Sequence, residues 1–218
     1  MKKLTRHPSK CLDGLTLGET EWMDAPKDII WAELDKLQNG FCAYCECKLS
    51  RKHIEHFRTR NMYPKETYNW SNLFGSCGDS SKQGGWQRCG IYKDNGAGQY
   101  DVNDLIKPDQ DDPSQYLRFL TTGKVIPRNE LTQPQKRKAE ETIRVFNLNN
   151  DTVVFNSRKT AILAVLPEVN ELYEMLEQLD DDFTIKDWHL LLDSSISDIK
   201  ELEFQTALEH SFRYNQAY

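Results

Sequence analysis

The sequence of 218 residues contains no apolar run that approaches the ~20 residues needed to cross a bilayer as a helix. Its mean hydropathy is −0.72 and 28% of its residues are charged, so we expect a well-solvated surface. The basic segment 1–8 has no apolar stretch behind it, which argues against a secretory signal. We therefore expect a cytoplasmic protein with no membrane partner.

Internal repeats, coiled-coil heptads and low-complexity tracts are also absent from the sequence. The length allows one domain with a real core, or a small domain with a helical companion. Six cysteines in an unexported chain are typical of metal ligands or free thiols rather than of disulfides. Cys11 and Cys47 lie outside the motif described below, and we interpret them as small, partly buried thiols.

A net charge of −6 is unusual for a protein that acts on nucleic acid, but the charge is unevenly distributed. The segment 46–93 has four acids and nine basic residues: Lys48, Arg51, Lys52, Arg58, Arg60, Lys65, Lys82, Arg88 and Lys93. A basic segment in an acidic chain can bind phosphates locally, while the acidic remainder avoids nonspecific nucleic acid or docks a basic partner. Charge runs are also common on ordinary solvated surfaces, so this charge asymmetry gives only modest support to nucleic-acid binding.

The N-terminal half predicts one helix and a small ribbon. Residues 1–24 lack periodicity and predict an extended arm, and a helix over 26–38 follows, with Asp24 as N-cap and Asn39-Gly40 as the stop. Residues 42–56 predict a two-stranded ribbon: a Cys-x2-Cys knuckle, a turn near Leu49–Lys52, and a strand that ends at His56. Residues 75–88 are rich in Gly and Ser and predict a loop.

The C-terminal half predicts mostly helix. Residues 119–126 contain Thr122-Gly123 and predict a hairpin, and helical patterns follow from Pro134 onward. One helix should stop near 147–150, a longer one should start near Asp151 and bend or break at Pro167, and two more should follow. We therefore expect an N-terminal arm (1–25), a core with its leading helix (26–130) and a helical region that docks a partner (131–218).

Four cysteines have spacings that suit a metal: Cys42-x2-Cys45, and Cys77 with Cys89 further on. Two thiolate pairs carried on loops are the usual way to complete a tetrahedral zinc site. A small ribbon with a Gly-rich loop has little core, so a structural zinc would stabilise it. Four unrelated thiols would not explain why they bracket the other motif residues. A thioredoxin-type redox site is disfavoured because the strand-then-helix context is missing.

Glu55-His56 is the predicted catalytic dipeptide. In a ββα-metal site, a carboxylate at the end of a strand holds a divalent cation and the next histidine deprotonates a water. A carboxylate suits Mg²⁺ or Mn²⁺, so the catalytic cation would differ from the structural zinc. Adjacent strand residues point in opposite directions, which is consistent with one side chain on the metal and the other toward water.

Other polar residues have supporting roles in this hypothesis. The amide of Asn72 would tie the loop between ribbon and helix and orient His56, and Lys93 would contact phosphate unless it is an ordinary solvated lysine. His53 has the alternation parity of Glu55 and could assist the metal. The three remaining histidines are interpreted as structural or surface residues: His7, His189 and His210.

These motifs together resemble the HNH endonuclease superfamily. The strings Cys42-Ala-Tyr-Cys45, Ile54-Glu55-His56-Phe57, Tyr68 to Cys77 and Cys89-Gly90-x2-Lys93 resemble a narrower group within it. That group is the PtuB-like nucleases of Septu-type and retron-linked antiphage systems. The segments 105–108 and 142–149 share the likeness, which covers roughly residues 30–160.

The resemblance implies an α+β fold with a zinc-stabilised ββα-metal core and a mainly helical C-terminal region. It also implies a bacterial defence effector that works with an ABC-type ATPase (PtuA-like), joined in retron settings by a reverse transcriptase and its single-stranded DNA. Its nuclease activity would be restrained until phage infection. One residue departs from the pattern: Gly90 stands where the family has a His or Asn. The catalytic metal would then be held by Glu55 with waters, or by a nearby group such as His53, Asp79 or Asp94.

The sequence therefore predicts a metal-dependent nuclease with catalytic residues Glu55, His56, Asn72 and Lys93. The alternative is a catalytically silent zinc module that binds nucleic acid or a protein. A third possibility is a structural subunit that functions mainly through its helical C-terminus. Whether the substrate is DNA or RNA is left open.

Overall fold

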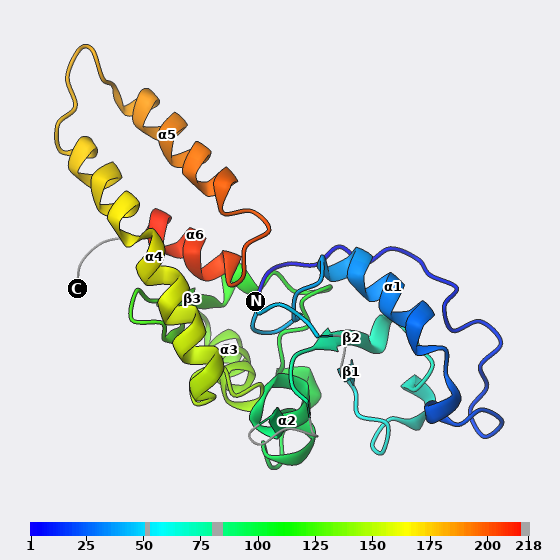
Figure 1. Ribbon diagram of the computed structural model, residues 1–218. Coiled ribbons are helices and arrows are strands. Elements are labelled where there is room, and N and C mark those ends of the chain that lie inside the picture. Colours follow the sequence, from blue (N-terminus) through cyan, green and yellow to red (C-terminus); the bar gives the residue numbers. More distant parts are fainter. Residues whose placement is uncertain (51–52, 80–84, 215–218) are drawn as a thin grey trace.

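The computed structural model describes residues 1–50, 53–79 and 85–214 (Figure 1). Within these residues, helices and two small antiparallel sheets make up a mixed fold, which confirms the predicted α+β class. No helix in the described ranges is long and apolar enough to cross a membrane. Short 3-10 helices lie at Trp22–Asp24, Pro64–Glu66, Trp70–Asn72, Gly85–Gln87, Val102–Asp104 and Pro113–Gln115.

The first sheet pairs β1 (His53–His56) with β2 (Leu73–Ser76) in antiparallel register. Glu55 lies opposite Phe74, and helix α2 (Cys89–Asn95) packs against both strands. The predicted strand that ends at His56 is confirmed, but the prediction that its partner lies within residues 42–56 was wrong. The strand pairs instead with β2, which begins seventeen residues after His56, while an isolated bridge joins Phe41 to Lys48 among the residues described before β1. Part of the predicted turn near Leu49–Lys52 lies outside the described residues.

Helix α1 (Lys27–Gln38) delivers the chain to the first cysteine pair. It ends as predicted at Asn39, whose left-handed φ of 53° suits a helix stop. Its N-cap is Pro26, not Asp24, because Asp24 closes a separate 3-10 turn. The Gln38 side chain bonds both the N–H and the C=O of Gly75, so α1 is tied directly to β2.

A second sheet and four helices form the rest of the chain. Strands β3 (Leu117–Phe119) and β4 (Val125–Pro127) make the predicted hairpin, with Gly123 at φ +88° in its turn. The helices are α3 (Gln133–Val145), α4 (Thr152–Leu176), α5 (Ile185–Asp198) and α6 (Gln205–Arg213). Helix α4 continues through Pro167, so the helix does not break there. Asp151 caps α4 by accepting from the backbone N–H groups of Val153 and Val154.

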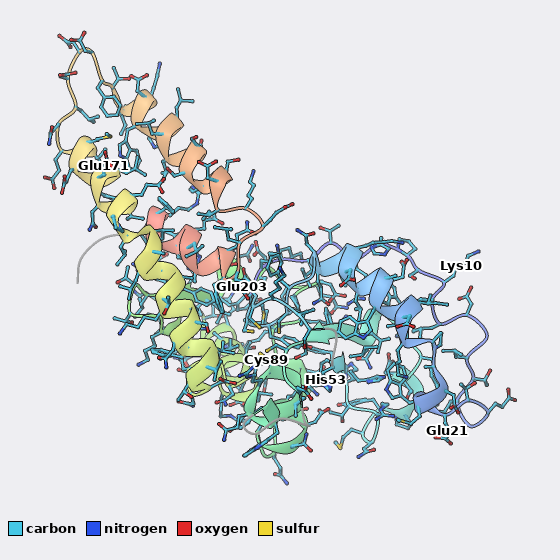
Figure 2. The ribbon with its side chains drawn as sticks, in the orientation of Figure 1. Lys10, Glu21, His53, Cys89, Glu171 and Glu203 are labelled. Atoms are coloured by element: carbon cyan, nitrogen blue, oxygen red, sulfur yellow. The ribbon has the colours of Figure 1, made fainter. Side chains whose placement is uncertain are left out.

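The helical region is joined to the cysteine-bearing part by buried contacts. The rings of Tyr44, between the first two cysteines, and Phe146, at the end of α3, stack with centroids 3.9 Å apart. The Glu46 carboxylate accepts from the Thr206 N–H at the start of α6. Beyond α6, the far ends of α4 and α5 project from the body as a helical hairpin (Figure 1). Glu171 lies on this projecting part of α4 (Figure 2).

Candidate active site

The four predicted cysteines converge on one point. Their Sγ atoms lie within 4.8 Å of one another and all four side chains are buried, so they could hold a metal ion such as zinc. The first pair comes from the knuckle after α1, the third from the end of β2 and the fourth from the first residue of α2: Cys42, Cys45, Cys77 and Cys89. The four-cysteine cluster therefore connects the segment after α1 with the residue that follows β2 and with the start of α2.

The thiols influence one another strongly. Burial opposes ionisation of Cys42, but hydrogen bonds from the neighbouring thiols hold its pKa well below the usual range. Hydrogen bonds with Cys42 and Cys45 raise the pKa values of Cys77 and Cys89. Cys47 is half-buried, and its Sγ lies 3.4 Å from that of Cys45.

Glu55 lies on the face of β1 that meets α2, and its side chain is fully buried. Its Oε2 is 2.8 Å from His53 Nε2, and its Oε1 is 2.8 Å from Lys93 Nζ. The contact between His53 and Glu55 places both side chains on one face of β1, as strand alternation predicts. His53 and Cys89 are both labelled near α2 in Figure 2. Burial disfavours the carboxylate, but Lys93 and His53 together lower the pKa of Glu55 below its usual value, so the group is charged.

Gly90 packs directly against this carboxylate. A Cβ on Gly90 would lie 2.2 Å from Glu55 Oε2, well inside contact distance. Gly90 departs from the HNH pattern, and glycine is the residue type that fits beside Glu55 in this arrangement. Two of the candidates for the missing ligand lie at this carboxylate: His53 contacts Glu55 Oε2 directly, and Asp94 Oδ1 is 2.5 Å from the Lys93 nitrogen that also contacts Glu55.

Lys93 is buried rather than solvated. Its Nζ contacts Glu55, Asp94 and, at 3.3 Å, the hydroxyl of Tyr100. Burial disfavours the ammonium, but the two carboxylates outweigh it and raise its pKa. Partial burial and the nearby Glu55 raise the pKa of Asp94 to about 6. Lys93 and Asp94 line a cavity of about 1170 Å³ whose other wall includes Arg137 and Arg144 of α3.

His56 is not among the residues that line this cavity. One ring nitrogen, Nε2, lies 3.1 Å from the Thr67 carbonyl, and the indole of Trp22 packs edge-on with ring centroids 4.4 Å apart. His56 is 5% exposed, and burial lowers the pKa of its imidazole to about 4. The ring is therefore neutral at neutral pH, and the Thr67 carbonyl fixes the proton on Nε2, which leaves Nδ1 as the acceptor.

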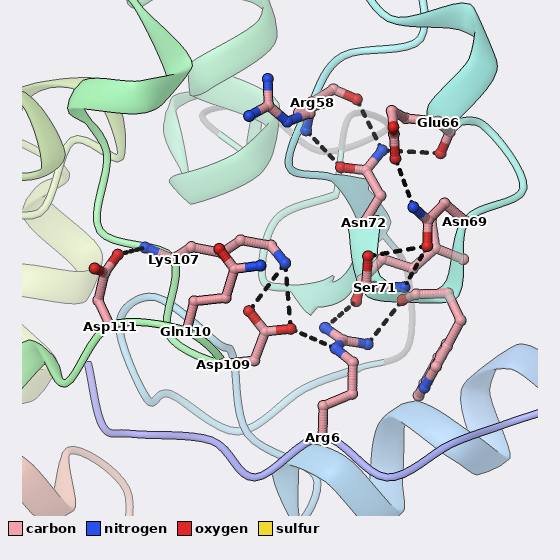
Figure 3. Close-up of polar contacts among 12 residues, drawn as sticks. Arg6, Arg58, Glu66, Asn69, Ser71, Asn72, Lys107, Asp109, Gln110 and Asp111 are labelled. Carbon is pink, nitrogen blue, oxygen red and sulfur yellow. Dashed lines mark hydrogen bonds and ion pairs between the residues drawn. The ribbon is translucent and has the colours of Figure 1, made fainter.

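Asn72 ties together the segment that follows His56 (Figure 3). Its Oδ1 accepts from the Arg58 N–H at 2.7 Å, and its Nδ2 donates at 3.0 Å to the carbonyls of Arg58 and Glu66. The prediction placed this amide in the loop between ribbon and helix. It instead bridges backbone groups within the connection between β1 and β2.

Several residues at the site were missed by sequence reasoning. Trp22, from the arm, covers His56, and Thr67 holds its ring. Arg6 donates to the carbonyls of Trp70 and Leu73 and so fixes the arm against β2 (Figure 3). No local motif marks these residues, because each acts across a large separation in sequence. Of the predicted basic segment, Arg51, Lys52 and Lys82 lie outside the described residues.

Comparison with known proteins gives a consistent likeness. No protein-family model matches the chain. A Septu protein PtuB of Bacillus thuringiensis is 27% identical over 158 residues, which cover 71% of this chain and 54% of the relative. A Septu protein PtuB of Bacillus mycoides (strain KBAB4) is 28% identical over 150 residues, covering 59% of this chain and 49% of the relative. The chain thus spans about half the length of these curated relatives, and the two matches support its resemblance to the Septu PtuB family.

Proposed function

We propose that the chain is a metal-dependent endonuclease of the HNH type that hydrolyses phosphodiester bonds in nucleic acid. The observation that carries the proposal is the packing of β1, β2 and α2 around Glu55, next to His56 and beside the four-thiol cluster. In this proposal the cysteines hold structural zinc, and the strands and α2 form a ββα-metal core. The likeness to Septu PtuB proteins suggests a role in antiphage defence.

The donor set around Glu55 fits a hard divalent cation. Carboxylates are the protein ligands that Mg²⁺ and Mn²⁺ prefer, and Glu55 is charged and buried beside a cavity wall. Glu55 Oε1 forms an ion pair with Lys93 Nζ at 2.8 Å, which shows that this oxygen already holds a positive charge. A cation bound there would stabilise negative charge on the scissile phosphate and its leaving oxygen.

His56 would act as the general base. Its neutral ring, with Nε2–H directed at Thr67, leaves Nδ1 able to take a proton from water. The ring is 5% exposed and the indole of Trp22 packs edge-on against it, so access of water and substrate to His56 would depend on Trp22. Asn72 would hold the backbone after His56 in place, and Lys93 would bind phosphate from the cavity wall.

We further propose that residues 131–218 dock a protein partner. By the resemblance, this partner is an ABC-type ATPase (PtuA-like), and in retron settings a reverse transcriptase with its single-stranded DNA joins the complex. The projecting ends of α4 and α5 give that region a shape that suits docking (Figure 1). The arm over residues 1–25 and the core over 26–130 would carry the chemistry.

One observation favours a second candidate, a catalytically silent zinc module that binds nucleic acid or protein. His56 is almost fully buried and does not line the cavity that Lys93 and Asp94 line. A protein with no need for a base could retain His56 as a packed core residue.

A cleavage assay separates the two candidates. The purified zinc-loaded chain is incubated with labelled duplex DNA, single-stranded DNA and bulk tRNA, in Mg²⁺ or Mn²⁺ and with EDTA as control. The proposal predicts cation-dependent cutting of at least one substrate, by the chain alone or with the co-expressed ATPase. Binding without cutting under both conditions would favour the silent module.

A further inference from the structure

Gly90 stands at the third HNH position, where the resemblance implies a His or Asn. No other residue can be placed there without moving Glu55, because a Cβ would overlap the carboxylate at 2.2 Å from Oε2 and 2.5 Å from the carboxyl carbon. Glu55 therefore fills the space that a longer residue on α2 would occupy. A cation at Glu55 would then be completed by waters or by a protein ligand from another position.

Asp94 is in the right place to supply it. It lies on α2 one turn beyond Gly90, and its Oδ1 is 2.5 Å from the nitrogen that also contacts Glu55 Oε1 at 2.8 Å. Two carboxylate oxygens from two elements thus converge on one positive centre. Mg²⁺ binds carboxylate oxygens at about 2.0–2.1 Å, closer than the ammonium lies to either oxygen, so the two carboxylates would close on a cation that replaced it.

The positive centre in the structure is the Lys93 ammonium. It is fully buried between the two carboxylates, which shows that this position favours a cation. The ammonium also lies 3.3 Å from the Tyr100 hydroxyl, and both residues line the cavity. A rotation of the Lys93 side chain toward Tyr100 would free the position and bring the ammonium to the place where a phosphate would enter.

His53 completes the arrangement from the other side. Its Nε2 contacts Glu55 Oε2 and not the oxygen that faces Lys93. It therefore positions the carboxylate, as groups outside the ligand set commonly do in metal sites.

We infer that Asp94 is the second protein ligand of the catalytic divalent cation, and that the Lys93 ammonium occupies the cation's place until it is displaced into the cavity. This inference rests on the proposed function, because it concerns the same site. It assigns Lys93 two successive positions, one on the carboxylates and one on the substrate phosphate.

The test measures the affinity of the full-length chain, with zinc on its cysteines, for Mn²⁺. The concentration of free Mn²⁺ is read from its electron paramagnetic resonance signal. Mn²⁺ prefers oxygen ligands, so the thiol cluster should not compete. Asp94→Asn should weaken binding by about tenfold or more. Asp101→Asn is the matched control: Asp101 lines the same cavity, and its carboxylate accepts from the Asn103 N–H, so binding should be unchanged.

Lys93→Met gives an independent readout. Without the ammonium, Glu55 and Asp94 repel each other, so the melting temperature should fall without divalent cation and rise with Mn²⁺ by more than in the unmodified chain. Mn²⁺ affinity should also increase. Unchanged Mn²⁺ affinity in Asp94→Asn, or no Mn²⁺ binding by the unmodified chain, would overturn the inference.

The outcome is separable from that of the proposed function. Cation-dependent cutting that survives Asp94→Asn would refute the role of Asp94 and leave the nuclease intact. Asp94-dependent Mn²⁺ binding without any cutting would support the ligand assignment and count against the nuclease.

Discussion

Asn72 offers a quantitative test of how the catalytic strand is held. Its side chain is 3% exposed and makes three hydrogen bonds to backbone groups of Arg58 and Glu66. Asn72→Ala leaves one N–H and two carbonyls without these partners. A buried polar group without its partner costs about 1–3 kcal/mol, and water can reach some of these groups, so we expect a loss of about 2–4 kcal/mol in the free energy of unfolding.

Asn69→Ala is the matched control. Asn69 also makes three hydrogen bonds, to the N–H and Oγ of Ser71 and to Glu66 Oε2, but it is exposed. Water can replace those bonds, so its loss should cost about 1 kcal/mol or less. Urea denaturation followed by tryptophan fluorescence gives both values. Equal destabilisation by the two changes would refute the claim that Asn72 holds the segment after His56.

Three further predictions follow from the site and its surroundings. Cys77→Ser should lose its bound zinc and its yield of soluble protein, whereas Cys11→Ser should keep both. Inductively coupled plasma mass spectrometry measures the zinc, and a zinc-free, normally folded Cys77→Ser chain would contradict the metal assignment. Trp22→Ala should raise the pKa of His56 from about 4 toward its usual 6.5, because exposure to water lowers the cost of charging the ring. The titration of His56 is followed by NMR, and an unchanged pKa would show that Trp22 does not cover the His56 ring. Burial also lowers the pKa of His210 to about 4, and its Nδ1 accepts from the Phe119 N–H. The unfolded chain then binds more protons between pH 6.5 and 4, so acidification through this window should lower the free energy of unfolding, and by less in His210→Asn; identical pH profiles would contradict this.

Local signals in the sequence predicted the elements well. The Asn39-Gly40 stop, the turn at Gly123 and the helices after Pro134 each depend on residues close together in the chain. The cysteine spacing likewise predicted a cluster, and the four Sγ atoms do converge. Strand alternation correctly placed the side chains of Glu55 and His53 on the same face of β1.

Pairings between distant segments could not be predicted in the same way. Four-residue strands carry too little pattern to name their partner, so the sixteen residues between His56 and Leu73 hid the pairing of β1 with β2. The environment of Lys93 was missed for a similar reason. A lysine one turn into a helix is usually solvated, and only the packing of α2 on β1 buries it against Glu55. The cover that Trp22 places over His56 comes from a segment with no periodic signal at all.

The central claim is that His56 is the base of a nuclease, and one comparison tests it most directly. Cleavage rates are measured for the zinc-loaded chain, for His56→Ala and for His189→Ala, whose exposed ring bonds the Ile185 carbonyl of its own helix. The account predicts that His56→Ala folds, keeps its zinc and no longer cuts, while His189→Ala cuts like the unmodified chain. A clean His56→Ala preparation that cuts at the unmodified rate would contradict it.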